Sequence, residues 1–162
     1  MTRAAEPVGK TELLRRLESR RDQLAQVLAG IPESMFLRPN AVGGWSVRDL
    51  LAHLAAHEQR ALAEIAAARR GERLVIEHAC VHEFNAGAVF AWAPLGRGEA
   101  LAAWDCSYRQ VVALVEELTE SDFAPGSALE HALGDTVDGA LANNTYEHYV
   151  EHLPGLEAID SS

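Results

Sequence analysis

Hydrophobic residues recur at intervals of three and four positions through several long stretches of this chain. The first stretch, residues 10–29, places such residues along one face: Leu13, Leu14, Leu17, Leu24, Val27 and Leu28. This spacing matches the period of an α-helix with one apolar face. Gly30 and Pro32 follow directly and favour an end to the helix. The pattern therefore predicts an amphipathic helix over residues 10–29.

A second helix is predicted to begin after Ser46. The Ser46 hydroxyl can accept a hydrogen bond from a free backbone amide, and Asp49, at the third helical position, can bond back to Ser46. Hydrophobic positions continue at helical spacing to about Arg70, namely Val47, Leu50, Leu51, Leu54, Leu62 and Ile65. The stretch 71–97 is weakly patterned and predicts only a short helix over residues 82–92.

Helical spacing returns in two further stretches, residues 99–118 and residues 136–153. Pro154 and Gly155 are predicted to end or kink the last helix. No stretch shows the sustained alternation of a β-strand. Four helices of roughly 18 to 25 residues joined by loops predict an all-α protein, a four-helix bundle formed by a single domain over residues 1–162.

Charge and hydropathy narrow the class of partner. The 162 residues carry a formal net charge of −10, with 24 acidic and 14 basic residues and no cluster of Lys or Arg. Such a surface repels phosphate backbones, so we expect no nucleic-acid partner. No apolar run approaches the ~20 residues that span a bilayer, and the N-terminus lacks the apolar segment of a signal peptide. We therefore expect no membrane association and a cytoplasmic location.

The last predicted helix carries two histidines on its apolar face. At about 100° per residue, a stripe within roughly 80° holds Val137, Leu141, Asn144, His148 and His152. A lone histidine there is usually a hydrogen-bonded core residue, but two of them each need a polar partner in a dry place. A metal ion would satisfy both, since neutral imidazole is a good ligand for Zn, Ni, Cu or Fe.

The second helix supplies candidates for a third ligand. His57 lies at the edge of its apolar arc and His53 about 40° further round, so the periodicity slightly favours His57 as the inward residue. Three imidazoles would leave an open coordination position, as in catalytic sites. Glu58 and Glu147 are candidates to hydrogen-bond the ligands, although a solvated carboxylate is the commoner role for each.

A third pair, His78 and His82, flanks Cys80 in the weakly patterned stretch. It can be interpreted as a His/Cys metal site or a lid over the bundle, or as an irregular connector with solvated polar residues. Backbone without a regular pattern offers no fixed geometry, so we favour the connector.

Two segments resemble signatures of the DinB/YfiT-like superfamily of four-helix-bundle metalloenzymes. Residues 43–62 read GGWSVRDLLAHLAAHEQRAL and resemble its second-helix signature, and residues 144–156 read NTYEHYVEHLPGL and resemble its C-terminal HxxxH. The chain most resembles the ClbS/DfsB-like and mycothiol-dependent maleylpyruvate isomerase-like members, including EFNAGAV at residues 83–89. The resemblance covers nearly the whole chain and is poorest over residues 71–82.

This resemblance implies a bundle with one long crossover connection that is often a homodimer. It also implies a divalent metal held by His53, His148 and His152, and so prefers His53 to His57. Three imidazoles suit Zn or Ni, with Fe as a further candidate. At His57 the family pattern leads us to expect Trp or another residue in place of histidine, which leaves three roles open for this residue: a fourth ligand, a base beside the metal, or a harmless substitution.

The activities of relatives suggest three functional hypotheses. The leading one is a metal-dependent hydrolase or thiol S-transferase/isomerase that acts on a small electrophilic or toxic molecule, in some relatives with a low-molecular-weight thiol. The second is a metal-independent, ClbS-like hydrolase that opens a strained ring of a natural product by acid–base chemistry, in a pocket with Trp45. The third is a non-enzymatic resistance protein that sequesters its small molecule. The candidate catalytic residues are His57, Glu58 and Tyr146.

Overall fold

A computed structural model describes residues 8–74 and 81–160 of the chain. Its long helices are α1 (Lys10–Gly30), α3 (Val47–Arg69), α5 (Arg97–Glu117) and α8 (Tyr146–Asp160). Its short ones are α2 (Glu33–Phe36), α4 (Val81–Trp92), the 3₁₀ helix η2 (Glu120–Phe123), α6 (Ala128–Leu133) and α7 (Val137–Ala142). The described residues contain no strand, only an isolated bridge between Val42 and Trp45. The prediction of an all-α fold is confirmed.

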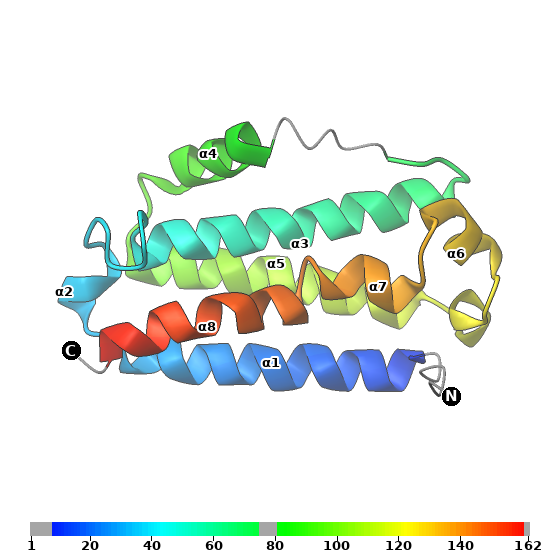
Figure 1. Cartoon of the computed structure of the whole chain (residues 1–162), viewed down its shortest axis with the longest axis horizontal. Helices are drawn as coiled ribbons and strands as arrows, with labels where there is room; N and C mark the ends of the chain where they lie inside the picture. Colours follow the sequence, from blue (N-terminus) through cyan, green and yellow to red (C-terminus); the bar gives the residue numbers. More distant parts are fainter. Residues whose placement is uncertain (1–7, 75–80, 161–162) are drawn as a thin grey trace, which may run out of the picture.

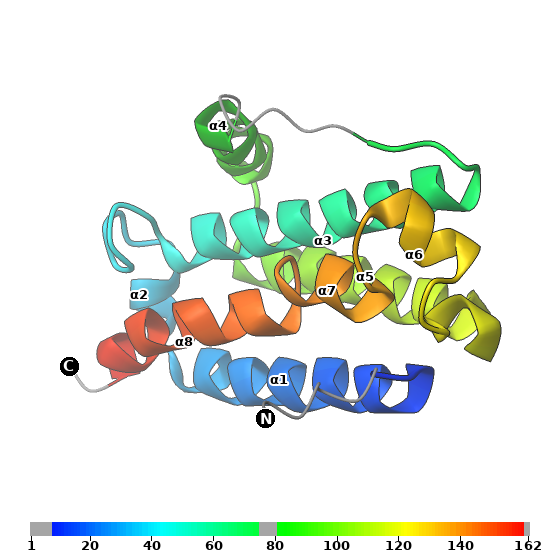
Figure 2. The ribbon, with the colours of Figure 1, turned by 45° about the vertical axis from the view of Figure 1, so that its right-hand side comes forward.

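The four long elements form a bundle with a crossover (Figure 1). Helices α1 and α8 run in one direction, and α3 and α5 run in the other. Because α3 and α5 are parallel, the chain between them must return the length of the bundle, and this connection carries α4. Figure 2 shows α4 lying across the outside of α3. No helix among the described residues is long and apolar enough to cross a membrane.

The apolar faces predicted from the sequence meet inside the bundle. The four long helices and α7 contribute fully buried side chains, among them Leu13, Leu17, Leu24, Leu50, Leu54, Ile65, Val111, Val115, Leu141 and Leu156. Burying a side chain of this size contributes roughly 1.5–3 kcal/mol to stability. The predicted start of the second helix is also confirmed. The Asp49 amide donates to Ser46 Oγ at 3.1 Å, and the Ser46 amide donates to Asp49 Oδ2 at 3.0 Å.

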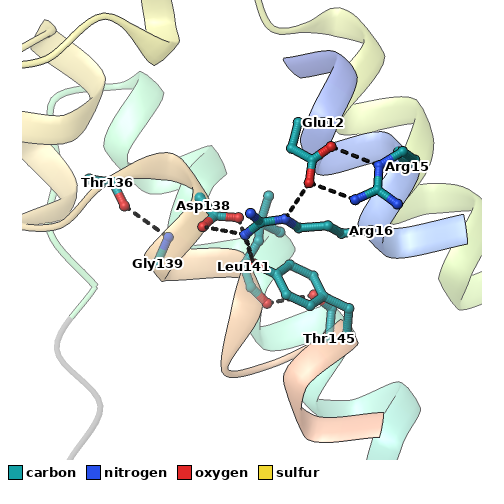
Figure 3. A network of polar contacts seen from close by, with 9 residues as sticks. Glu12, Arg15, Arg16, Thr136, Asp138, Gly139, Leu141 and Thr145 are labelled. Atoms are coloured by element: carbon teal, nitrogen blue, oxygen red, sulfur yellow. Dashed lines mark hydrogen bonds and ion pairs between the residues drawn. The ribbon is translucent and has the colours of Figure 1, made fainter. Parts of the chain in front are cut away.

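The prediction of one last helix over residues 136–153 is wrong in two respects: the helix is interrupted, and it extends beyond Leu153. The segment is broken into α7 and α8 at residues 143–145, where the Thr145 hydroxyl donates to the Leu141 carbonyl at 2.6 Å (Figure 3). This bond replaces regular helical pairing, as Ser and Thr side chains often do. Both sides of the break still face the bundle, since Val137, Leu141 and His148 are buried and Asn144 contacts His57.

Pro154 does not end the helix, because α8 continues through it to Asp160. Proline has no N–H, so the Val150 carbonyl loses its helical partner. Val150 is 42% exposed, and its backbone can therefore be solvated. Beyond the proline, Leu156 and Ile159 are buried in the core. Their burial keeps the last turns of α8 on the bundle despite the lost hydrogen bond.

Candidate metal centre

Four histidines from α3 and α8 come together in one cluster. His53 Nε2 lies 2.9 Å from His148 Nε2, and His152 Nε2 lies 3.1 Å from the same atom. The His57 ring packs against His148 and His53, with centroid separations of 4.4 and 4.6 Å. We call His53, His57, His148 and His152 the histidine cluster. Both predicted pairs thus converge, although they are 91 or more positions apart in sequence.

Hydrogen bonds to asparagine fix two of these rings. Asn85 Oδ1 on α4 lies 3.1 Å from His53 Nδ1, and Asn144 Oδ1, at the break before α8, lies 3.1 Å from His57 Nδ1. An amide oxygen only accepts, so each Nδ1 carries the proton and each Nε2 keeps its lone pair. Metal-binding histidines in proteins are held in the same way by partners on their other nitrogen.

The cluster could hold a divalent cation. Ligand nitrogens about 2.0–2.1 Å from a tetrahedral metal lie about 3.3 Å apart, and His148 Nε2 lies at close to this separation from His53 Nε2 and from His152 Nε2. A second set, His53, His57 and His148, has ligand atoms all within 4.8 Å of one another and could also hold a metal ion. Within the described structure, His57 Nε2 is buried without a hydrogen-bond partner, as a nitrogen reserved for a ligand would be.

The surroundings lower the pKa values of His53, His148 and His152 and so favour their neutral forms, the state that binds metals. Burial, with the neighbouring charges of His57 and His152, lowers the pKa of His53 to about 4. Burial, with the charges of the other three histidines, lowers the pKa of His148 to about 2. Burial also lowers the pKa of His152. Each of these rings therefore keeps a nitrogen with a free lone pair, which can bind a metal ion, at pH values below neutral.

These shifts predict that the metal-free protein loses stability as the pH falls. Below pH 6.5 the unfolded histidines take up protons, whereas His53 and His148 in the fold do not until about pH 4 and below. Each of these two histidines therefore lowers the free energy of unfolding by up to about 1.4 kcal/mol for every pH unit of acidification. Glu58 has the opposite effect between about pH 7 and 4.5. Its raised pKa means that the folded protein binds a proton at Glu58 in this range while the unfolded chain does not, which stabilises the fold as the pH falls. We expect a net loss on the order of 2 kcal/mol from pH 7.5 to 5.

The measurement is urea unfolding in EDTA at several pH values between 7.5 and 5. The matched comparison is His131→Ala, which removes an exposed histidine of α6 and should leave the profile unchanged. An unfolding free energy that stays flat or rises toward pH 5 would contradict the prediction.

The structure does not bring every predicted site residue to the cluster. Tyr146 is buried, but its hydroxyl donates to Asp138 Oδ1 at 2.6 Å and lies 3.4 Å from Arg16 Nη1. Arg16 also pairs with Glu12 of α1, in the network shown in Figure 3. Burial and the Asp138 contact raise the pKa of Tyr146 to about 12, which makes it a poor base. Its place is the junction of α1, α7 and α8.

Glu58 is fully buried, so the solvated role that we considered commoner for this residue is wrong. Its Oε1 accepts a hydrogen bond from the Tyr149 hydroxyl of α8. Burial raises its pKa to about 7, partly offset by Ser107, Tyr149 and the positive charge of Arg21. Arg21 in turn lies over the Trp104 ring at 3.0 Å. Glu147, in contrast, is exposed as expected.

Other predictions concern the periphery of the cluster. His53 is more deeply buried than His57, contrary to the angular count, because Asn85 of α4 and the Trp45 ring, 4.8 Å away, cover it. His82 is exposed at the start of α4, and the His78 and Cys80 predictions lie outside the described residues. Sequence reasoning missed Asn85 and assigned no role to Asn144 beyond its place on the stripe.

The fold and the cluster define a class: a helical bundle in which four histidines from two helices meet and could hold a metal ion. The family model described as the mycothiol maleylpyruvate isomerase N-terminal domain matches residues 17–150. The chain belongs to this family, within the DinB/YfiT-like superfamily that the sequence resembles. A search of curated proteins gave no match.

Solved structures share the fold at low sequence identity. The colibactin self-resistance protein ClbS, in complex with a dsDNA, is 17% identical, with a TM-score of 0.78 over 96% of this chain and 97% of that one. An uncharacterised protein from Escherichia coli UTI89 is 18% identical, with a TM-score of 0.76 over 96% and 94%. A protein from Streptococcus pneumoniae is 17% identical, with a TM-score of 0.79 over 99% and 94%. At these identities the likeness shows the fold alone.

Proposed function

We propose that this protein is a metal-dependent enzyme that adds water or a low-molecular-weight thiol to a small electrophilic molecule. The observation that carries the proposal is that His148 Nε2 lies 2.9 Å from His53 Nε2 and 3.1 Å from His152 Nε2. These three residues would hold Zn or Ni, with Fe as a further candidate. The bound cation would act as a Lewis acid and lower the pKa of the attacking water or thiol.

His57 is the base in this proposal. Its Nδ1 proton is directed to Asn144, so its buried Nε2 faces the cluster with a lone pair and can accept a proton from the attacking water or thiol. Asn144 holds the ring in this tautomer. Asn85 holds His53 in the same way. Glu58 of α3 accepts a hydrogen bond from Tyr149 of α8 in the core and so links the two helices that carry the histidines.

The test compares metal content and turnover. Metal-supplemented protein should carry close to one Zn, Ni or Fe per chain and turn over a panel of epoxides and activated alkenes, with water or with glutathione as a test thiol. Chelation should remove the activity, and reloading should restore it. His57→Ala should keep the metal yet lose most of the turnover, since general base catalysis contributes about 10²–10⁴-fold. Protein that binds no metal when offered it would overturn the proposal.

The two alternatives give different results in the same experiment. A metal-independent, ClbS-like hydrolase would keep its activity through chelation but lose it in His57→Ala or His148→Ala. A sequestering resistance protein would consume no more than about one equivalent of the small molecule. The ClbS structure contains a dsDNA, so the expectation that this acidic chain binds no nucleic acid remains a prediction. A homodimer likewise remains a prediction.

A further inference from the structure

Helix α4 covers α3 without being buried itself. None of its residues is buried, and Phe84 and Phe90 are 39% and 82% exposed. The helix is nevertheless rich in apolar residues, and it supplies two contacts to the histidine cluster. Asn85 bonds to His53, and the Phe84 ring stands edge-on to the His57 ring at 5.7 Å. Helix α4 is thus attached to the bundle at the cluster and leaves open space beside it.

A groove of about 470 Å³ lies between α3 and α4 at this point. Its apolar lining consists of Ala56, Ala63, Leu74, Phe84 and Ala88. This volume falls in the range of small-molecule sites, about 300–1,000 Å³. The groove opens beside the cluster, because Phe84 contributes both to its lining and to the contact with His57.

The polar residues of the groove carry no free charge. Arg60 lies along it, but its Nε is paired with Glu64 Oε1 at 3.1 Å. Gln59 also lines it and donates to Gln110 and Ser107 of α5. An anion would therefore find an arginine that is already neutralised, and a cation would find no carboxylate in the lining. An uncharged apolar group suits these walls best, because burying a charge without a partner is costly.

We propose that this groove binds the uncharged, apolar arm of the substrate and places the reactive group of the substrate beside His57. The inference rests on the proposed function and specifies its substrate class: a hydrophobic, uncharged electrophile with an apolar arm. The alanines of α3 form the floor and leave room for the arm. Phe84 is a positioning residue at the junction between the groove and the cluster.

The binding experiment uses the neutral fluorescent probe N-phenyl-1-naphthylamine with metal-free protein. Ala63→Phe places a large ring in the groove at an exposed helical position, and it should weaken the binding of the probe at least about tenfold. Ala102→Phe adds the same ring at an exposed position of α5 outside the groove and should leave binding unchanged. Equal affinity in wild type and Ala63→Phe, or equal loss in both variants, would overturn the proposal.

The activity experiment uses metal-loaded protein and a series of terminal epoxides from 1,2-epoxybutane to 1,2-epoxydecane. In the wild type kcat/KM should rise with chain length, and in Ala63→Phe this rise should disappear, whereas Ala102→Phe should keep it. If Ala63→Phe weakens probe binding but the protein neither binds metal nor turns over epoxides, the proposed function is refuted and the groove is supported as a binding site. Turnover without a chain-length dependence would refute the groove alone. A loss of dimers specific to Ala63→Phe would assign the groove to a second copy of the chain and overturn the proposal.

Discussion

Replacing His148 with alanine should abolish stoichiometric metal binding. Its Nε2 is the atom that contacts both His53, at 2.9 Å, and His152, at 3.1 Å, so its loss removes the centre of the set. Loss of a partner that only orients a ligand lowers metal affinity about 10–100-fold, so loss of this ligand should exceed 100-fold. Elemental analysis of protein purified with added metal, followed by zinc titration at pH 7.5, measures both the occupancy and the affinity.

The control is His131→Ala, which removes a histidine at an exposed position of α6. It should bind metal as the wild type does. Circular dichroism must show that both variants keep their helices, because His148 is buried and the substitution leaves a cavity. A folded His148→Ala protein that retains one metal per chain would refute the proposed centre.

Further substitutions decide which histidine is the third ligand. If His53, His148 and His152 hold the metal, His152→Ala should lose metal as His148→Ala does, and His57→Ala should retain it. If instead His57 completes the set, His57→Ala should lose the metal. Asn144→Ala would then also weaken binding about 10–100-fold, because Asn144 orients the His57 ring. Metal loss in both His57→Ala and Asn144→Ala would thus identify His57 as a ligand, once by removing the ring and once by removing the partner that orients it.

The sequence predicts the helices well because burial on one face imposes a period that can be counted. The capping box at Ser46 and Asp49 fixes the start of α3, and both partners make the expected bonds. The HxxxH pair, His148 and His152, can also be interpreted from the sequence, because two imidazoles on an apolar stripe need a polar partner and a metal ion would serve both. The convergence of this pair with His53 follows from the bundle and from the family resemblance, and the period of α3 alone points to His57.

The features that escape prediction depend on contacts between helices. Periodicity treats a helix as continuous, so it misses the break at residues 143–145, which a side-chain hydroxyl of Thr145 stabilises. It also treats the polar side of α3 as solvated, although α4 covers His53 there through Asn85. The α4 segment comes from the weakly patterned stretch, where the sequence gives no packing partner. Its place over the cluster is a tertiary property.

The burial of Glu58 did have a signal in the sequence. Leu54, Glu58, Ala61 and Ile65 follow one another at intervals of four and three, so the carboxylate occupies a core position on the apolar stripe of α3. A charged residue at such a position is rare unless it is paired. Its partners come from three other helices, and no local pattern in the sequence could name them. They are Arg21 on α1, Trp104 and Ser107 on α5, and Tyr149 on α8.

Replacing Glu58 with alanine should lower the free energy of unfolding by about 3–5 kcal/mol, because it leaves a cavity in the core and a buried donor without its acceptor. The Tyr149 hydroxyl would lose its acceptor, and the buried Arg21 guanidinium, which is paired with Asp105 of α5 at 3.6 Å, would lose the nearby negative charge of Glu58. Urea unfolding of metal-free protein at pH 7.5 measures the effect. The matched control is Glu64→Ala on the same helix, whose half-buried pair with Arg60 should be worth at most about 1 kcal/mol.

A double variant tests whether the cost comes from the uncompensated charge. Arg21→Met combined with Glu58→Leu removes both charges and replaces them with apolar side chains of similar size. Buried ion pairs replaced in this way are often no less stable than the original. The double variant should therefore be more stable than Glu58→Ala. Compared with the single variants Arg21→Met and Glu58→Leu, it should show a coupling energy between the two positions above about 1 kcal/mol. Additive losses would mean that the carboxylate and the guanidinium are independent. The residues around Glu58 would then stabilise the bundle through the packing of Trp104 and Tyr149 rather than through charge.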